Sequence, residues 1–512
     1  MRESLLGRIF MKRVMRVAGG ILLAGLVVLA LREIYVRVTT DEIYLIYTSD
    51  IHGHVLPEKH YDASTGLTWE TGGAGSLNTY LSFLDKPYLL LDAGDIFMGT
   101  PEGALAKGGF IVKLMNDLKY EAAAAGNHEF DYGIEHFRAL AGKANFPFLC
   151  CSLTNRDGSE IPFIKPYEIF DVGGHSIGVT AVIEEDLHKV LAGDTATGFS
   201  VSYASSSVQR VADELADKCD IVVVLSGLGL DGDKELASRI TGVDIIAGGE
   251  THIALKKALM INGIMVCEPG WALRYAGKIK MRVGKRGLVR AEWKLAQLLS
   301  SKYPEGNFVS QRIGEYENED YKRVNIPVGS ASMWIQRYSG GPVNPMGNLI
   351  ADAMRMAAGS DFAFQNEYGI RDEIAPGTVR IRDLVTVSPF GNTIVTMKLT
   401  GGELRELLEQ SATREKGLLQ ISGLKMIFNS ELPKGRKLLN VIVKDAEIDP
   451  EKEYTLATNS FLAGGGDGFV TFKKGRDIKD TAMKLLDATI EYFKNNSPVS
   501  PSKEERITDI RS

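Results

Sequence analysis

Four short polar segments, each at the point where an apolar run ends, constrain the fold of this chain more than any other feature. They are Asp50-Ile51-His52, Gly94-Asp95, Gly126-Asn127-His128-Glu129 and Gly249-Glu250-Thr251-His252. The runs before them are aliphatic, aromatic or β-branched, which is typical of buried strands. Helical patterns lie between the runs, and strands that alternate with helices predict βαβ units. Because ligands bind outside the carboxyl ends of the strands in such sheets, we expect an α/β fold that collects these polar side chains at one edge.

The chemistry of these side chains predicts a metal centre. Asp50 and His52, two residues apart, can hold one cation from an extended turn, and Asp95 has two oxygens with which to bridge two cations. Paired ions roughly 3.5–4 Å apart hold both the attacking and the leaving oxygen of a phosphoryl transfer. His128 would then assist the leaving group, with Asp131 holding its ring. Each segment taken singly also fits an ordinary turn, so the metal prediction depends on all four occurring in order.

These segments resemble the calcineurin-like metallophosphoesterases and, more closely, the bifunctional UDP-sugar hydrolase/5'-nucleotidase family. The resemblance extends from about Ile43 to about Phe472. It implies a four-layered α/β-β/α sandwich as the catalytic domain and a second α/β domain that binds substrate. It also implies the ligands of a first metal ion, which are Asp50, His52, Asp95 and His252.

Two positions depart from the family's pattern for a second metal ion. The family's strand-end histidine corresponds to Gly227, and the first histidine of its Gly-His-x-His motif corresponds to Glu250. The second pocket would then contain only oxygen ligands, from Asp95, Asn127 and Glu250 with water. Oxygen ligands favour Mn, Mg or Ca over Zn. We therefore expect one Zn- or Mn-like site and a second site that is weak, different or absent.

Three motifs in the second half of the chain resemble the family's nucleotide-binding domain. By this resemblance, two phenylalanines stack on the base, an arginine meets phosphate or carboxylate, and asparagine and aspartate bind base and ribose or fix the loop. Such stacking contributes roughly 1–3 kcal/mol per base. Tyr368 replaces a glycine of the family's motif. The implied substrate-binding residues are Asn366, Gly369, Arg371, Phe390, Asn392, Phe461 and Asp467.

The same motifs predict the domain organisation. We expect a cytoplasmic basic stretch and signal anchor over 1–40, a catalytic domain over 41–300, a linker or hinge over 301–333, a substrate-binding domain over 334–495 and a loose polar end over 496–512. The net charge of -6 and the pI near 5.9 argue against a broad nucleic-acid surface, which would be basic.

The N-terminus predicts a membrane segment. Five basic residues precede an uncharged run from Val17 to Leu31, and such a positive flank stays in the cytoplasm. We favour an uncleaved anchor in the cell membrane with the catalytic domains outside the cytoplasm. Cleavage near Ala30, which would give a periplasmic or secreted protein, is the alternative. An even count of four cysteines permits disulfides in an exported chain, although Cys150 and Cys151 have the apolar context of core residues.

Together these features predict an exported, metal-dependent phosphohydrolase that removes phosphate from nucleotides by metal-activated water. UDP-sugars and other phosphoesters stay open as substrates. The alternative is a nucleotide-binding or sensing paralogue with a degraded second metal site and little turnover. A related sulfur-compound hydrolase is a third possibility, against which the two base-stacking phenylalanines argue. Nothing in the sequence indicates the oligomeric state.

Overall fold

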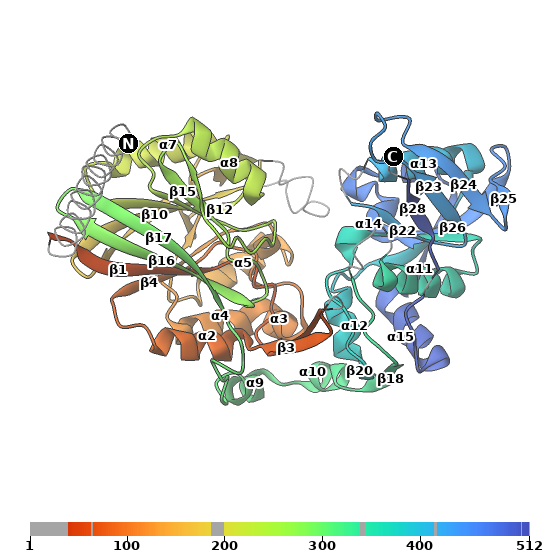
Figure 1. The fold of residues 1–512 in the computed structure, drawn as a ribbon, viewed down its shortest axis with the longest axis horizontal. Helices are drawn as coiled ribbons and strands as arrows, with labels where there is room; N and C mark the ends of the chain where they lie inside the picture. Colours follow the sequence, from red (N-terminus) through yellow and green to blue (C-terminus); the bar gives the residue numbers. More distant parts are fainter. Residues whose placement is uncertain are drawn as a thin grey trace, which may run out of the picture. The chain divides into compact units, whose positions relative to one another are not determined.

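The computed structural model describes residues 39–62, 65–185, 199–337, 342, 344–413, 417–502 and 504–510. They form two compact units, which are described separately (Figure 1). Of these described residues, the first unit comprises those up to Asp50, those within Leu77–Asp95 and those within Met115–Leu298. The second comprises those within Ile51–Ser76, those within Ile96–Leu114 and those from Leu299 onward. The N-terminal membrane helix predicted from the sequence lies outside the described residues. Among the residues that are described, no helix has the length and apolar character needed to span a membrane.

The first unit contains two sheets. The larger sheet has the order β17-β16-β1-β4-β5-β6-β8 and the smaller one the order β14-β15-β13-β12-β10-β9. The strands of the larger sheet are β1 (Asp41–Thr48), β4 (Tyr88–Asp92), β5 (Ala122–Ala124), β6 (Phe148–Leu149), β8 (Ile164–Lys165), β16 (Tyr275–Gly284) and β17 (Gly287–Gln297). Those of the smaller sheet are β9 (Tyr167–Val172), β10 (His175–Ile183), β12 (Ile221–Gly227), β13 (Ile245–Gly248), β14 (Leu259–Ile261) and β15 (Ile264–Cys267).

The two sheets pack face to face between helices. One continuous core joins alternate residues of β1 and β4, such as Leu45 and Leu91, to alternate residues of β12, such as Val223. On the outer face of the smaller sheet, Val224 packs with the apolar sides of α7 (Ala204–Leu215) and α8 (Gly229–Arg239). On the larger sheet, the Phe148 ring of β6 contacts Phe137 of α5 (Ile134–Ala141), with ring centroids 4.9 Å apart. These layers form the α/β-β/α sandwich that the sequence predicts.

Parallel pairing brings the predicted polar segments to the carboxyl edges of the sheets. In the larger sheet, β4 lies parallel to both β1 and β5. In the smaller sheet, β12 lies parallel to both β10 and β13. Asp50 and Asp95 follow β1 and β4, Asn127 follows β5, and Glu250 follows β13. The order of polar turns along the sequence therefore becomes a row of polar turns in space.

The second unit has an α/β core of its own. Its five-stranded sheet has the order β22-β19-β26-β21-β27, and a four-stranded sheet has the order β25-β24-β23-β28. Helix α13 (Gly401–Ala412) packs on one face of the five-stranded sheet, while α11 (Pro345–Ala358) and α15 (Leu485–Asn496) pack on the other. The strands are β19 (Phe362–Asn366), β21 (Thr393–Thr400), β22 (Leu419–Ser422), β23 (Lys425–Phe428), β24 (Leu438–Val443), β25 (Ala446–Glu447), β26 (Glu453–Asn459), β27 (Arg476–Lys484) and β28 (Ile507–Asp509).

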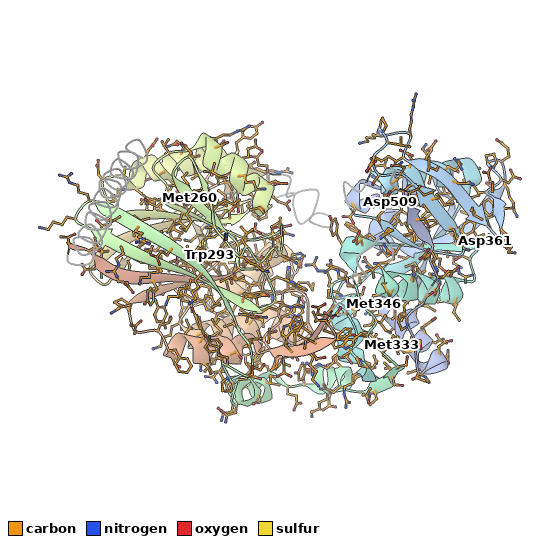
Figure 2. The ribbon with its side chains drawn as sticks, viewed as in Figure 1. Met260, Trp293, Met333, Met346, Asp361 and Asp509 are labelled. Atoms are coloured by element: carbon orange, nitrogen blue, oxygen red, sulfur yellow. The ribbon has the colours of Figure 1, made fainter. Side chains whose placement is uncertain are left out.

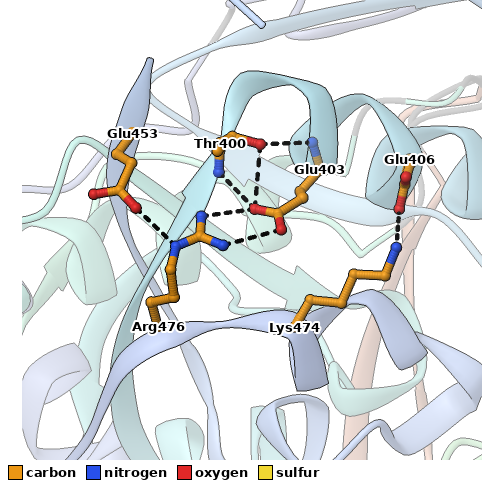
Figure 3. A network of polar contacts seen from close by, with 6 residues as sticks. All are labelled: Thr400, Glu403, Glu406, Glu453, Lys474 and Arg476. Atoms are coloured by element: carbon orange, nitrogen blue, oxygen red, sulfur yellow. Dashed lines mark hydrogen bonds and ion pairs between the residues drawn. The ribbon is translucent and has the colours of Figure 1, made fainter. Parts of the chain in front are cut away.

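A polar network fixes the start of α13 against two strands (Figure 3). The Thr400 hydroxyl accepts from the Glu403 amide, and the Glu403 carboxylate accepts from the Thr400 amide at 2.8 Å, which is a capping box. Arg476 donates to both oxygens of Glu403, at 3.0 and 2.7 Å, and also to Glu453. The hydrogen bond from Arg476 lowers the pKa of Glu403 to about 2. This helix start is therefore tied to β26 and β27 by charge-assisted bonds.

The end of the chain is anchored where the sequence predicts a loose segment. Strand β28 pairs in parallel with β23, and its Asp509 (labelled in Figure 2) accepts from the Ser430 hydroxyl at 2.8 Å. Arg506 is buried and donates to both carboxylate oxygens of Asp352 in α11, each at 2.8 Å. This segment is polar in composition, yet its described residues include two buried apolar side chains, Val499 and Ile507, and one buried bidentate ion pair.

The remaining elements are short or connect the sheets. The helices are α2 (Gly73–Ser82), α3 (Pro101–Ala104), α4 (Gly109–Leu118), α9 (Ser310–Tyr316), α10 (Glu319–Val324), α12 (Ile381–Val387) and α14 (Ser460–Ala463). The short strands are β2 (Glu58–Asp62), β3 (Leu67–Thr71), β7 (Leu153–Asn155), β11 (Phe199–Val201), β18 (Pro327–Ala331) and β20 (Gly377–Arg380). All four cysteines are free thiols, and Cys150 and Cys151 are buried as core residues.

Candidate metal centre and substrate-binding loops

The predicted metal ligands come together at the sheet edge. Within the described part of the chain, three groups of side chains have ligand atoms that all lie within 4.8 Å of one another. They are Asp50–His52–His252, His52–Asp95–His128 and Asp50–Asp95–Glu250. Asp50, His52 and Asp95 are buried, and each of them belongs to two groups. Of the residues predicted from the sequence, Asp95 alone joins the group that contains His128 to the group that contains Glu250.

The backbone at these positions is strained. Five of the predicted ligands have a left-handed φ: Asp50 (51°), His52 (47°), Asp95 (60°), Glu250 (73°) and His252 (59°). Residues with a side chain rarely adopt this conformation, and it persists only where the surrounding structure enforces it. Hydrogen bonds supply that enforcement. For example, the Asp50 amide donates to the Gly94 carbonyl at 2.9 Å, and the Glu250 amide donates to Asp50 Oδ1 at 2.9 Å.

The charges of this cluster fit a bound cation. Burial raises the pKa of Asp50 well above its usual range, and the nearby Asp95 carboxylate adds to the effect. Burial, and to a smaller extent the Asp95 carboxylate, also raises the pKa of Glu250 well above its usual range. Asp50 Oδ2 is buried without a hydrogen-bond partner. Carboxylates buried together are unstable unless protons or cations compensate them, so the donor set suits divalent metal ions.

Asn127 lies against the same carboxylate. Its terminal amide group is 3.1 Å from both oxygens of Asp95. With the nitrogen turned toward Asp95, the amide donates hydrogen bonds; with the oxygen turned that way, the two residues present three acceptor atoms to a cation. Either orientation places Asn127 where the sequence predicts a ligand.

His128 and Asp131 form a pair beside the cluster. Nδ1 of His128 is 2.7 Å from Asp131 Oδ2, which orients the imidazole ring. The backbone N–H of His128 donates to Asp95 Oδ1 at 3.1 Å, so the turn that carries the histidine is tied to the candidate metal ligands. Glu129 is buried and accepts from the amides of Asp95 and Gly126, at 3.0 and 2.7 Å. Glu129 stands in the same sequence motif, but the sequence alone does not indicate this structural role.

The structure leaves room for a side chain at Gly227. A Cβ placed on Gly227 would meet only the Val182 carbonyl oxygen, at 3.6 Å. Glu184 follows β10 directly, and its neighbour Ile183 pairs with Gly227. The charge of Glu184 contributes to the raised pKa of Glu250. Sequence reasoning missed Glu184, although the apolar run of β10 that ends at an acidic residue is the same signal as in the other four segments.

The predicted substrate-binding residues of the second unit lie on loops at one edge of its five-stranded sheet. Strands β19 and β26 are parallel and end at Asn366 and Asn459, while the antiparallel β21 begins at that edge, where Ile394 pairs with Asn459. The side-chain nitrogen Nδ2 of Asn366 donates to the Asp467 carboxylate at 2.8 Å. The Asn392 side-chain oxygen accepts from the Ser460 hydroxyl at 3.1 Å.

The remaining four predicted residues stand on the same loops. The Arg371 guanidinium carbon is 5.9 Å from the centre of the Phe390 ring. A Cβ on Gly369 would lie 2.6 Å from the side-chain amides of Asn366 and Gln365, so any larger residue there would have to displace these two buried groups. Phe461 follows β26 and is 37% exposed, which leaves its ring accessible for stacking.

A pair of buried carboxyl groups, which sequence reasoning also missed, lies around Gly248, at the end of the strand that leads to Glu250 and His252. Asp233 and Glu268 are both buried, and a Cβ on Gly248 would lie 2.0 Å from Asp233 Oδ2 and 3.2 Å from Glu268 Cγ. Neither oxygen of Asp233 makes a hydrogen bond of normal geometry. Burial raises the pKa of Asp233 to about 7, opposed by the Ser226 hydroxyl. Burial also raises the pKa of Glu268 to about 8, with Asp233 adding to it.

This pair predicts that the folded protein loses stability as the pH rises from about 5 to about 8. In that window the native state keeps protons that the unfolded chain releases, so raising the pH favours unfolding by about 1.4 kcal/mol per pH unit and per group. Below the unfolded pKa values both states are protonated, and above pH 8 both are ionised. The melting temperatures of Asp233→Asn and Glu268→Gln should therefore fall less between pH 5.5 and 8.5 than that of the unmodified protein. Asp231→Asn, at an exposed position of α8, is the control. An unchanged pH profile in both variants would contradict the assignment.

Comparison with known proteins identifies the domains of this fold. Residues 43–254 match the family described as calcineurin-like phosphoesterase, and residues 327–474 match the 5'-nucleotidase C-terminal domain. A 5'-nucleotidase of Diplobatis ommata is 27% identical over 93% of this chain and 91% of its own length. Protein UshA of Yersinia enterocolitica is 25% identical over 92% of this chain and 94% of its own length. The trifunctional nucleotide phosphoesterase YfkN of Bacillus subtilis is 26% identical over 92% of this chain, which spans only 35% of that protein.

Solved structures agree. The 5'-nucleotidase precursor of Thermus thermophilus has a TM-score of 0.82 at 27% identity and covers 92% of this chain and 99% of its own. The sulfate thiohydrolase SoxB of the same organism has a TM-score of 0.80 at 18% identity, over 91% of this chain and 96% of its own, which shows a shared fold alone.

The fold and the matched domains define a metallophosphoesterase, and hence a hydrolase. The chain belongs to the 5'-nucleotidase family of these enzymes, with a calcineurin-like phosphoesterase domain followed by a 5'-nucleotidase C-terminal domain.

Proposed function

We propose that this protein is an exported, metal-dependent phosphohydrolase that removes phosphate from nucleotides. The observation that carries the proposal is the cluster of Asp50, His52, Asp95 and His252 beside the His128–Asp131 pair. A divalent cation held by this cluster would polarise the phosphate and activate the attacking water. His128 would donate a proton to the leaving oxygen, and Asp131 would stabilise the charged imidazole and set its orientation.

The loops of the second unit would bind the nucleoside. Phe461 and Phe390 would stack on the base, and Asn392 would bond to the base edge. Arg371 would meet phosphate oxygens in a bidentate manner. Asp467 accepts from Asn366, so we assign it first to fixing the loop and second to binding ribose hydroxyls.

We further propose that the two cation positions differ. The first has two histidine ligands and suits Zn or Mn, while the second has only oxygen ligands and suits Mn, Mg or Ca, or stays weakly occupied. Glu184 and Glu250 add negative charge on that side, which supports a hard cation there and weakens attraction for a phosphate dianion. Metal analysis of the purified chain tests this assignment, and two tightly held zinc ions per chain would refute it.

Gly227 and Glu250 also support a second candidate function, a nucleotide-binding or sensing protein with little turnover. Assays of nucleoside monophosphates and UDP-sugars with added Mn, Zn, Mg or Ca distinguish the two. Turnover that a chelator and His128→Ala both abolish supports the enzyme. Tight nucleotide binding without turnover under any of these metals supports the sensing protein.

We propose a location outside the cytoplasm, with residues 17–31 as a membrane anchor. The support is the basic flank and the uncharged run of the sequence. Cell fractionation with mass spectrometry of the mature N-terminus tests it. Catalytic domains recovered in the cytoplasmic fraction would refute the proposal, and an N-terminus that begins after Ala30 would replace the anchor with a cleaved leader.

A further inference from the structure

One loop contacts both the first and the last of the metal-binding segments. It runs from Glu268 to Arg274, directly after β15, and we call it the bracing loop. On the side of the first segment, the Ser49 hydroxyl donates to the Gly270 carbonyl at 2.8 Å, and the Ala272 amide donates to the Asp50 carbonyl at 2.9 Å. On the side of the last segment, the Thr251 hydroxyl donates to the Glu268 carboxylate. The bracing loop is thus bonded next to Asp50 and next to His252.

The backbone of the bracing loop is strained in the same way as the ligand positions. Ala272 and Leu273 are consecutive, buried residues with left-handed φ values of 58° and 50°. Two neighbouring residues with side chains in this region are energetically costly and need support from their surroundings. The strain turns the chain sharply between Trp271 and Arg274, so that both side chains can lie on the same side as His252.

Trp271 packs on the imidazole of His252. The two rings are nearly parallel, at 10°, with centroids 4.8 Å apart. The guanidinium carbon of Arg274 lies 4.4 Å from the centre of the same indole ring. A metal ion binds histidine through a lone pair in the plane of the ring, so a neighbour stacked on the face fixes the plane without competing for the nitrogen. His252 Nε2 is 3.7 Å from Asp50 Oδ1, which places that edge toward the other ligands.

We propose that Trp271 is a positioning residue that holds the imidazole plane of His252 for metal binding, and that Arg274 holds Trp271 by a cation–π contact. This inference rests on the proposed function, because it assumes that His252 binds the metal. Hydrogen-bonded partners of metal-ligating histidines typically change metal affinity by about 10- to 100-fold, and we expect the stacked indole to act on a similar scale.

Metal titration of the full-length, chelator-treated protein tests the proposal. With Co2+ or Mn2+ as the probe, Trp271→Leu should bind roughly tenfold or more weakly than the unmodified protein, while Trp271→Phe keeps the stack and binds almost normally. Arg274→Gln should show a smaller loss in the same direction. Trp69→Leu is the matched control, because Trp69 packs on His60, a histidine outside the predicted ligand set, with centroids 5.5 Å apart. Normal metal affinity in a folded Trp271→Leu chain would overturn the proposal.

Tryptophan fluorescence provides a second readout that does not depend on Trp271→Leu folding. Of the four tryptophans, Trp271 is the one that stacks on a predicted ligand, so Co2+ should quench it strongly. Trp271→Phe should lose most of the quenching while it still binds Co2+. Quenching that is unchanged in Trp271→Phe would overturn the inference. A chain that binds no metal at all would instead refute the proposed function.

Discussion

Replacing Asp95 with asparagine should lower nucleotide hydrolysis by about a thousandfold or more and should lower the amount of bound metal. Asp95 belongs both to the group with His52 and His128 and to the group with Asp50 and Glu250. Asparagine keeps the shape of the side chain but removes the charge that two cations would share. A loss of about 4 kcal/mol of transition-state stabilisation corresponds to a thousandfold in rate. Steady-state kinetics with AMP and metal analysis on the same preparation measure the two effects.

Asp92→Asn is the control for this substitution. Asp92 is the last residue of β4, the strand that precedes Asp95. It is fully buried and accepts from the Thr48 hydroxyl at 2.6 Å, but it belongs to none of the three ligand groups among the described residues. Its loss should lower the melting temperature and leave the metal content of the folded protein nearly unchanged. If Asp95→Asn retained full metal content and full turnover, Asp95 would not be the bridging ligand.

Replacing His128 with asparagine should lower kcat by about 10²- to 10⁴-fold and should leave the metal content nearly unchanged. His128 is paired with Asp131 at 2.7 Å, which orients its ring for proton transfer. Because a metal-ligating histidine can make the same contact and His128 belongs to one of the ligand groups, the metal content of the variant distinguishes the two roles. Asp131→Asn should cause a smaller loss, because the imidazole remains and only its orientation and charge stabilisation are weakened. His136→Asn, at a histidine of α5 that packs on Tyr132, is the control. Metal lost together with activity in His128→Asn would show that His128 is a ligand.

The sequence is enough to predict the sheet edge, because that signal is local. An apolar strand followed by a polar turn is encoded within ten residues, and parallel strands bring such turns together without further information. Asp50, Asp95 and Glu250 were found in this way. Gly227 and Glu250 were identified as departures by the resemblance to the family's metal-binding pattern. In the structure, a Cβ on Gly227 would have free space around it.

The contacts that support the site could not be predicted in this way. Trp271 meets His252 because two buried residues adopt left-handed backbone angles, which neither composition nor spacing indicates. Asp233 and Glu268 come from a helix and a strand end, and their approach around Gly248 depends on packing alone. The end of the chain lacked a long apolar run, so pairing of β28 with β23 was not foreseen.

Removal and return of metal tests the central claim most directly. The purified chain is dialysed against a chelator, its metal content is measured by mass spectrometry, and AMP hydrolysis is followed before and after Mn2+ or Zn2+ is restored. We predict that activity disappears with the metal and returns in proportion to the metal bound, and that Asp95→Asn neither rebinds it fully nor recovers. Undiminished AMP hydrolysis by a chain shown to be free of metal would contradict the account.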